Sequence, residues 1–372
     1  MREIYTVFQL ELTQRLRSSK WRWALGLWLV VLLGLVALQF GYVQANQPNI
    51  PGVEEPDAAG AIAGFNLLIL MLVGLVIAPA LAATAINGDR RDGVLALVQA
   101  TPVKAHQLVI AKLLAAWFAS LLFLVVSLPV LLGLLAFGDI RWWDLVLGLV
   151  VVALVLLAVC VMALGFSAIA AGPVASTLMS YLVLVAVLIG IPIVVLMSLP
   201  FTATNEQRPV AQITDYSVED YGAVPTEQWC EVVTREDTSV QPHRVGWLLY
   251  GQPLLLLSDA LPTGSFGDSP TTWGRMLLMQ ANAKPQESDQ RASTCEQLQQ
   301  ELTETPRSVT DNFGVWGDTG REPKYQRAET TPGRGWLAAL AVYLGVGFTG
   351  AVLAWRRLRV PLRRLAKDDR IA

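Results

Sequence analysis

The sequence predicts an all-α polytopic membrane protein. It has six transmembrane helices, an N-terminal interfacial helix, and a mixed, loosely packed extracytoplasmic segment between the fifth and sixth helices. Of the 372 residues, 53% are hydrophobic and only 16% are charged, whereas soluble domains have about 25% charged residues. Several apolar runs reach the roughly 20 residues that a helix needs to cross a bilayer. Basic residues gather beside these runs mainly on one side of the membrane.

The transmembrane helices follow from the apolar runs. We place them at residues 23–43, 61–86, 113–137, 145–170, 177–199 and 336–355. Helix is the expected conformation because the backbone must satisfy its own hydrogen bonds inside a bilayer. Pro79, Pro129 and Pro192 fall within spans, where we expect them to kink the helix.

The distribution of basic residues predicts the orientation. Lysine and arginine gather in the N-terminal stretch, in the loop after the second span and in the C-terminal tail, at Arg2, Arg15, Arg17, Lys20, Arg22, Arg90, Arg91, Lys104, Lys112, Arg356, Arg357, Arg359, Arg363, Arg364, Lys367 and Arg370. The opposite loops carry acidic residues. Basic loops stay in the cytoplasm, so we expect a multi-pass protein of the plasma membrane with both termini cytoplasmic.

The N-terminal segment, residues 1–22, has the pattern of an amphipathic helix in the inner interface. Ile4, Phe8, Leu12 and Leu16 recur every four residues, with charged residues between them. A signal peptide cleaved after Ala45 is the competing interpretation, but the charged lead and the apolar run are both too long for one. A frayed polar tail remains the alternative for this segment.

The domain organisation follows from these spans. Residues 23–199 hold the first five spans, with a cytoplasmic loop at 87–112. Residues 200–335 form the extracytoplasmic domain, 336–355 the sixth span, and 356–372 a basic cytoplasmic tail. Within 200–335, the best-patterned pieces are 245–261 and 273–281, and residues 284–324 are polar enough to be partly disordered.

Three cysteines are too few for a disulfide scaffold. Cys230 and Cys295 both lie in the extracytoplasmic segment, where a disulfide can persist, so they are a disulfide candidate. Two free thiols are the alternative. We expect no metal site, because the sequence has no CxxC pair and only His106 and His243 as histidines.

The loop at 87–112 is the most informative stretch. It begins with a charged cluster, Asp89-Arg90-Arg91-Asp92, followed by Gly93. A short apolar helix pattern starts at Val94 and continues through Leu97, and Thr101-Pro102 ends it, because proline cannot continue the hydrogen bonding. Lys112 marks the return to the bilayer, with a stem long enough to snorkel. The prediction is a short amphipathic helix on the cytoplasmic face; the alternative is an ordinary charged anchor beside a span.

This loop resembles the coupling loop of ABC transporter permeases of the type-2 exporter class. The shared pattern is the acidic–basic–basic–acidic–Gly–x–Leu–x–Leu run and the later Thr-Pro-Val, in a loop between the second and third of six spans. The chain is similar in particular to permeases of multicopper-enzyme-maturation systems and their actinobacterial relatives. These carry a motif like Gln252-Pro253…Ser258-Asp259-Ala260 before the last span. Asp89 and Asp92 depart from the family, in which a glutamate is common.

The resemblance implies a division of labour between subunits. We expect two copies of a separate ABC ATPase, which bind ATP and Mg²⁺, and a second permease subunit, identical or similar. The chain has no G-x-x-x-x-G-K-[ST] motif, so no cofactor and no catalysis of its own are expected. The residues expected to couple to the ATPase are Asp89, Arg90, Arg91, Asp92, Gly93, Val94, Leu97, Thr101 and Pro102.

The polar residues inside the spans bear on the substrate. The spans carry essentially no ionisable group at mid-depth. Helix-to-helix packing explains most of the polar residues left, which are Asn66, Ser120, Ser127, Ser167 and Ser180. This composition favours a lipid-like or amphipathic substrate over a small ion.

The sequence also argues against other classes of protein. A membrane-embedded enzyme needs a catalytic cluster at a membrane face, and no such cluster is found in the spans. The near-neutral net charge of -2 argues against a nucleic-acid partner. A non-transporting sensor or assembly factor acting through its ectodomain remains the alternative to an exporter.

Overall fold

The computed structural model describes residues 2–46, 58–91, 105–138, 140–170, 172–213, 230–266, 269–282 and 335–358. Within these residues, six helices are long and apolar enough to cross a membrane, at Ser19–Ala45, Ala58–Asp89, Ala105–Leu135, Trp142–Ile169, Pro173–Thr202 and Gly335–Arg356. The predicted all-α polytopic fold is confirmed. The chain divides into two compact units, one of Met1–Pro192, Leu249–Leu278 and Ala328–Ala372, the other of Ile193–Leu248 and Met279–Arg327.

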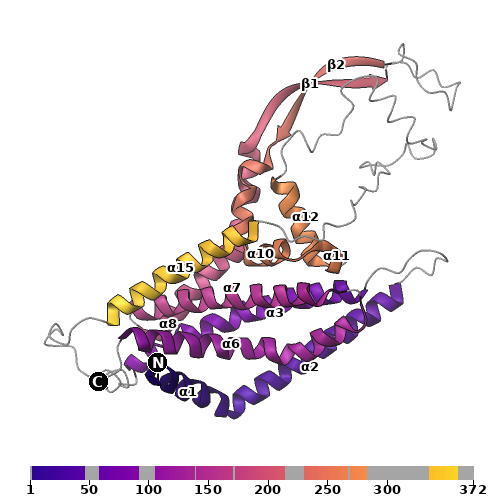
Figure 1. The fold of residues 1–372 in the computed structure, drawn as a ribbon. Coiled ribbons are helices and arrows are strands. Elements are labelled where there is room, and N and C mark those ends of the chain that lie inside the picture. Colours follow the sequence, from indigo (N-terminus) through magenta and orange to yellow (C-terminus); the bar gives the residue numbers. More distant parts are fainter. Residues whose placement is uncertain are drawn as a thin grey trace. The chain divides into compact units, whose positions relative to one another are not determined.

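Three long helices form the centre of the first unit: α3 (Ala58–Ala82), α6 (Ala105–Leu135) and α7 (Trp142–Ile169). They lie side by side (Figure 1) and share one apolar core, in which Leu67, Leu131 and Leu156 are buried. Helix α15 (Gly335–Leu358) packs along α7. Their backbones approach closely because Gly165 faces Gly350: a Cβ atom at Gly165 would lie 2.8 Å from the Gly350 Cα.

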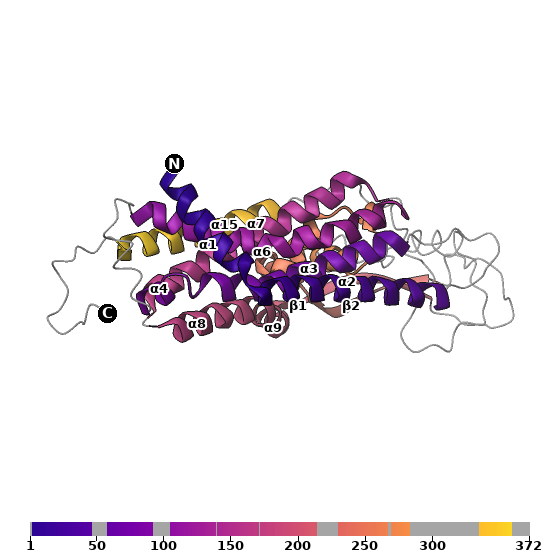
Figure 2. The same cartoon turned by 90° about the horizontal axis from the view of Figure 1, so that it is seen from below.

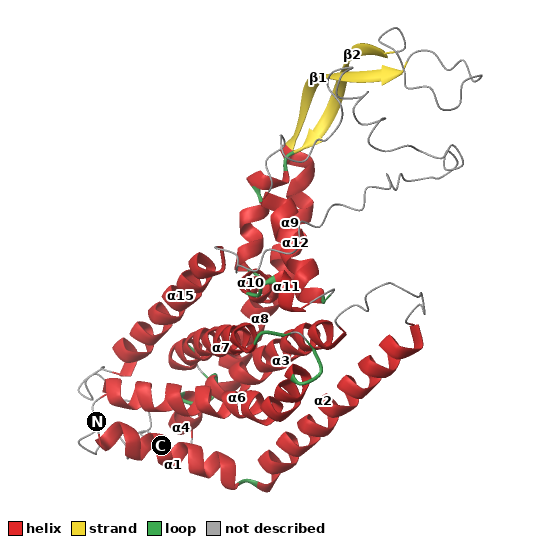
Figure 3. Cartoon of the chain, turned by 45° about the vertical axis from the view of Figure 1, so that its right-hand side comes forward, coloured by secondary structure: helices red, strands yellow, loops and turns green. Residues whose placement is uncertain are grey.

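The N-terminal segment folds as two helices, α1 (Arg2–Arg17) and α2 (Ser19–Asn46), with a bend at Ser18 (Figure 3). The first span therefore begins four residues before the predicted Trp23. The helix continues through charged residues because Lys20 and Arg22 are exposed, and a hydropathy pattern registers only the apolar run.

Helix α1 packs against α6, as Figure 2 shows. The side chains of Ile4, Phe8, Leu12 and Leu16 are all half-buried, and the Phe8 and Phe118 rings meet edge to face at 5.3 Å. The predicted amphipathic pattern is thus the packing face of α1.

The fifth span is interrupted. It consists of α8 (Pro173–Val185), a π-helical turn η1 (Ala186–Gly190), α9 (Ile191–Ser198) and a 3₁₀ turn η2 (Leu199–Thr202). In the π turn the Ile191 N–H donates to the Ala186 carbonyl, five residues back. Pro192 has no N–H, and its ring would clash with the carbonyl four residues earlier in an α-helix, so the wider turn directly before it accommodates the proline. Pro79 and Pro129 lie inside continuous helices.

The second unit contains a β-hairpin. Strand β1 (Ala203–Ile213) pairs antiparallel with β2 (Cys230–Val240), with Ala203 opposite Val240 and Ile213 opposite Cys230. At the base of the hairpin, Gln241 Nε2 donates to the Thr204 hydroxyl at 2.8 Å. A 3₁₀ turn, η4 (Pro242–Arg244), follows. The sequence predicted a mixed segment here without locating these strands.

The stretch from 249 to 278 belongs to the same compact unit as the spans. It comprises the end of η5 (Gly246–Gly251), α10 (Pro253–Ala260), α11 (Thr263–Phe266) and most of α12 (Pro270–Asn282). Leu256 and Leu257 are 0% exposed and lie in the core shared by α3, α6 and α7. This stretch is more tightly packed than the sequence indicates, because α10 turns its leucines toward the spans.

Candidate coupling site at the α4 end

One end of the helix bundle is formed by α1, α4 (Asn87–Arg91), the start of α6 and the last turns of α7 and α15; we call it the α4 end. Here Val7 of α1 packs on an apolar cluster that contains Ile86, Leu108, Leu164 and Ala354. The opposite end, where α10 and α11 meet the starts of α3, α7 and α15, is the α10 end. Most of the residues expected to couple to an ATPase follow α4 directly in the sequence.

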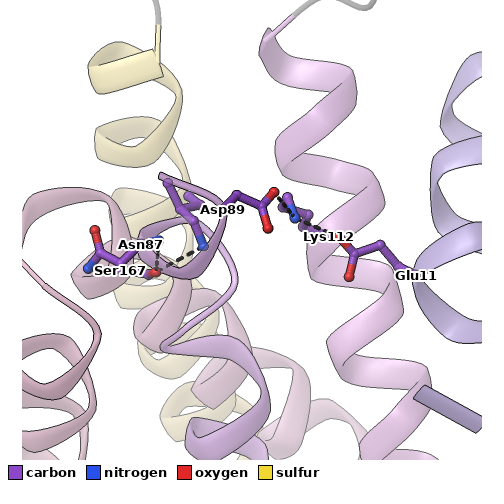
Figure 4. Close-up of polar contacts among 6 residues, drawn as sticks. Glu11, Asn87, Asp89, Lys112 and Ser167 are labelled. Carbon is purple, nitrogen blue, oxygen red and sulfur yellow. Dashed lines mark hydrogen bonds and ion pairs between the residues drawn. The ribbon is translucent and has the colours of Figure 1, made fainter. Parts of the chain in front are cut away.

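Hydrogen bonds from neighbouring helices fix the turn between α3 and α4. The Ser167 hydroxyl of α7 accepts the N–H groups of Ile86 (3.1 Å) and Asn87 (3.2 Å), as Figure 4 shows. The Ser176 hydroxyl of α8 donates to the Ala83 carbonyl at 2.7 Å. The Asn87 side chain donates to the Gly172 carbonyl at 3.3 Å. The first turn of α4 is therefore attached to both α7 and α8, which satisfies backbone groups that the end of α3 leaves open.

A buried lysine joins α4 to two other helices. Lys112 of α6 is 2% exposed, and its Nζ lies 2.6 Å from Glu11 Oε1 of α1 and 2.6 Å from Asp89 Oδ2 of α4 (Figure 4). We expected Lys112 to extend toward the membrane surface. It points into the protein instead, because an ammonium group removed from water requires charged partners and two carboxylates supply them. A shift of α4 must therefore move α1 and α6 with it, or break an ion pair.

The structure places the predicted coupling residues as follows. Asp89 faces inward to Lys112 and is part of the base of the loop. Arg90 lies in α4, and Arg91, the last residue of α4, is exposed. Asp92, Gly93, Val94, Leu97, Thr101 and Pro102 lie outside the described residues, as does Cys295 of the disulfide candidate. Cys230 begins β2, but its side chain is not described.

Sequence reasoning missed the partners that organise this end: Glu11, Asn87 and Ser176. A usable signal existed for Glu11, because a carboxylate in an amphipathic helix at the membrane boundary needs a cation, and Lys112 lacks a partner nearby in sequence. Ser167 was predicted to serve helix packing, and it does so by holding the turn before α4.

Of the other polar groups of the spans, Ser127 and Asn66 bond a neighbouring helix as predicted, whereas the hydrogen bonds of Ser120 and Ser180 stay within their own helices. Trp28 Nε1 donates to the Ser127 hydroxyl at 2.9 Å, and Asn66 Nδ2 donates to Gln39 Oε1 at 2.8 Å. Ser120 and Ser180 donate to carbonyls in their own helices. Within the part of the chain that the structure describes, no three His, Cys, Asp or Glu side chains are grouped so as to hold a metal ion.

Comparison with known families agrees with this architecture. The family model described as "ABC-2 family transporter protein" matches residues 5–280, from α1 to α12. No curated protein matches the chain. The family supplies the membrane component of ABC transporters, is not itself catalytic, and implies an ATPase partner. With its six apolar helices, this multi-pass membrane protein belongs to the ABC-2 transporter family and is a permease component of an ABC transporter.

Proposed function

We propose that the chain is the membrane-spanning half of an ATP-driven exporter, coupled to a separate ATPase through the loop at 87–112. The observation that carries this proposal is the ion pair between Asp89 and Lys112. These residues lie on either side of the stretch that is expected to contact the ATPase. A loop whose two ends are held together by an ion pair transmits a displacement by the ATPase to the spans. A loop with flexible ends would deform instead.

The path of such a push follows from the contacts at the α4 end. Through Ser167 and Ser176 it reaches α7 and α8, and through Lys112 it reaches α6 and α1. ATP binding that draws two ATPase subunits together would bias the spans toward one of two openings, because a ligand shifts a conformational equilibrium by its differential affinity.

The partners in this proposal are two ATPase subunits, which hold ATP and Mg²⁺, and a second permease subunit. The protein lies in the plasma membrane with its α4 end and both termini on the cytoplasmic side. Exposed Arg17 of α1 and Arg91 of α4 support this orientation, since basic residues are retained on the cytoplasmic side. The described spans carry charged residues only near their ends, which supports a lipid-like or amphipathic substrate.

The test is purification of the tagged chain in mild detergent, with identification of co-purifying proteins and an ATP hydrolysis assay. We expect a stoichiometric P-loop ATPase, and we expect Leu97→Asp to lower its turnover in the complex at least tenfold. Leu277→Asp is the matched control: it makes the same change in an exposed leucine of α12, so it should leave turnover unchanged.

Two outcomes contradict the proposal. If no ATPase co-purifies in several detergents, the chain acts as a sensor or assembly factor through its ectodomain. If Leu97→Asp and Leu277→Asp have the same effect on turnover, the loop at 87–112 is not the coupling element.

A further inference from the structure

The motif Gln252-Pro253…Ser258-Asp259-Ala260 has no role in the coupling site, yet the structure gives each of its ends a capping function. At its start, Gln252 Oε1 accepts the Leu255 N–H at 2.7 Å, which caps α10, and Pro253 occupies the first turn, where a missing N–H costs nothing. At its end, Asp259 reaches a different helix.

Asp259 caps the last span from outside that span. Its Oδ2 accepts the Trp336 N–H at 2.8 Å, in the first turn of α15, and the carboxylate is in a residue only 5% exposed. The first N–H groups of a helix have no partner within it, and a negative charge is favoured at that end of the helix dipole. An N-cap residue ordinarily stands directly before its helix in the sequence; Asp259 caps α15 from 77 residues away.

The surrounding residues shape the space for this contact. A Cβ atom at Gly335 would lie 2.1 Å from the Tyr250 ring, so only glycine allows the start of α15 to approach this closely. The Tyr343 hydroxyl, two turns into α15, donates to the Gly251 carbonyl. Ser258 contacts Gly274 of α12, where a Cβ atom would lie 2.4 Å from the serine hydroxyl. The three residues Ser258, Asp259 and Ala260 therefore face α12, α15 and the core.

The charges around Asp259 are few. Arg275 of α12 is buried, donates to the Leu261 carbonyl at 3.2 Å and favours the charged carboxylate. Tyr250 is the neighbouring phenol, and burial together with Asp259 raises its pKa. Helix α3 carries no titratable side chain, and Asp144 near the start of α7 is held by Arg141 and Ser265.

We propose that Asp259 is a positioning residue of the transport cycle, which holds the first turn of α15 on α10 so that the two move together at the α10 end. Its part in transport rests on the proposed function, whereas the cap itself does not. The first experiment therefore uses the permease alone, reconstituted in nanodiscs, and follows amide hydrogen exchange in the peptide that covers residues 335–340.

Three variants separate the cap from general loosening. Asp259→Ala removes the acceptor and should speed exchange in this peptide about tenfold, the change expected when a helix cap is lost. Asp259→Asn keeps an acceptor oxygen of the same shape and should restore most of the protection. Asp144→Asn is the matched control, since it alters another buried carboxylate at the α10 end, whose contact is with α11. Its exchange in 335–340 should equal that of the wild type.

Equal exchange in the wild type and Asp259→Ala would overturn the cap. If the cap is present, Asp259→Ala should also lower ATP turnover of the complex at least threefold and Asp259→Asn should recover it, because the cycle needs α15 to follow α10. Unchanged turnover in Asp259→Ala would overturn the positioning role. Failure of an ATPase to co-purify would instead contradict the proposed function and leave the exchange result standing.

Discussion

The charged side chains that the structure buries each have a partner from another element. Lys112 binds carboxylates from α1 and α4, Asp144 accepts from Ser265, and Asp259 accepts from the start of α15. Near the ends of membrane spans such charges are too costly to leave unpaired. Each pair therefore fixes the position of one helix relative to another, and its removal should be measurable.

Lys112→Met should destabilise the chain, because it leaves Glu11 and Asp89 facing each other without a cation. We expect a loss of about 2–4 kcal/mol in the free energy of unfolding, which is less than for a fully buried pair because both carboxylates are partly exposed. Thermal unfolding in detergent measures the change. Lys20→Met, which removes an exposed lysine of α2, is the control and should have little effect.

Replacing the whole cluster gives a second check. Glu11→Gln and Asp89→Asn, added to Lys112→Met, remove the repulsion and should recover most of the lost stability, since apolar or neutral replacements of an entire buried ion cluster are often tolerated. A triple variant no more stable than Lys112→Met would show that packing, and not charge, governs this site.

Asp259 should make stability depend on pH. Burial raises the pKa of Asp259, while the N–H groups of Trp336 and Gly335 and the charge of Arg275 oppose the shift. A raised pKa in the folded protein means that the folded state binds the proton more strongly, so this contribution is present at low pH and is lost as pH rises through that pKa. Asp259→Asn should therefore be more stable than the wild type near neutral pH, with a difference in Tm that shrinks toward about pH 4. A difference that stays constant would contradict the assignment.

At the scale of elements, close backbone approach holds the last span in place. Helices α7 and α15 meet where Gly165 faces Gly350, and Gly347 lies against Val161 one turn earlier. Packing between membrane helices gains little from the hydrophobic effect, because lipid is as apolar as leucine, so contact area between backbones matters more.

This contact predicts opposite effects for one substitution at two positions. Gly165→Ala should destabilise the chain by about 1–3 kcal/mol, because its Cβ would meet backbone atoms of Gly350. Gly345→Ala, on α15 with nothing within 4 Å of the added Cβ, should be neutral or stabilising, because alanine favours helix over glycine. Thermal unfolding of both variants, measured side by side, checks the sign; a loss at both positions would contradict the close approach.

The elements could be predicted from sequence only as far as local pattern determines them. Hydropathy located all six spans, since each is a continuous apolar run. It could not place the start of the first span, because Lys20 and Arg22 continue the span helix but the sequence pattern assigns them to the interfacial helix of residues 1–22. It did not predict the π turn before Pro192 either. The sequence signals that Glu11 and Lys112 each need a partner, but it does not pair them, since they lie 101 residues apart and the pairing depends on how α1 and α6 cross.

For the whole molecule, the two ends of the bundle differ in chemistry. Trp142 and Trp143 are exposed and stack at 3.8 Å at the start of α7, at the α10 end. Tryptophan favours the membrane–water boundary, so this pair supports a membrane boundary at the α10 end. Exposed Arg91 lies at the α4 end, which the proposed orientation places at the cytoplasmic boundary.

The orientation can be tested by labelling. A single cysteine introduced at Ser288 should react with an impermeant thiol reagent in intact cells, and one at Asp369 should react only after permeabilisation. Both should react equally in detergent, which controls for intrinsic reactivity. Labelling of Asp369→Cys before Ser288→Cys would reverse the proposed topology and place the loop at 87–112 on the wrong side for an ATPase.

The ion pairs of Lys112 also constrain the order in which the newly made chain can assemble. Glu11 is synthesised 101 residues before its partner, which at about 5–20 residues per second is a delay of roughly 5–20 s. During that interval α1 has no α6 to pack on. The start of α15 emerges later still and finds Asp259 already in place. The N-terminal helix, although made first, is therefore docked only once the third span has been inserted, and the last span closes a bundle that is otherwise built.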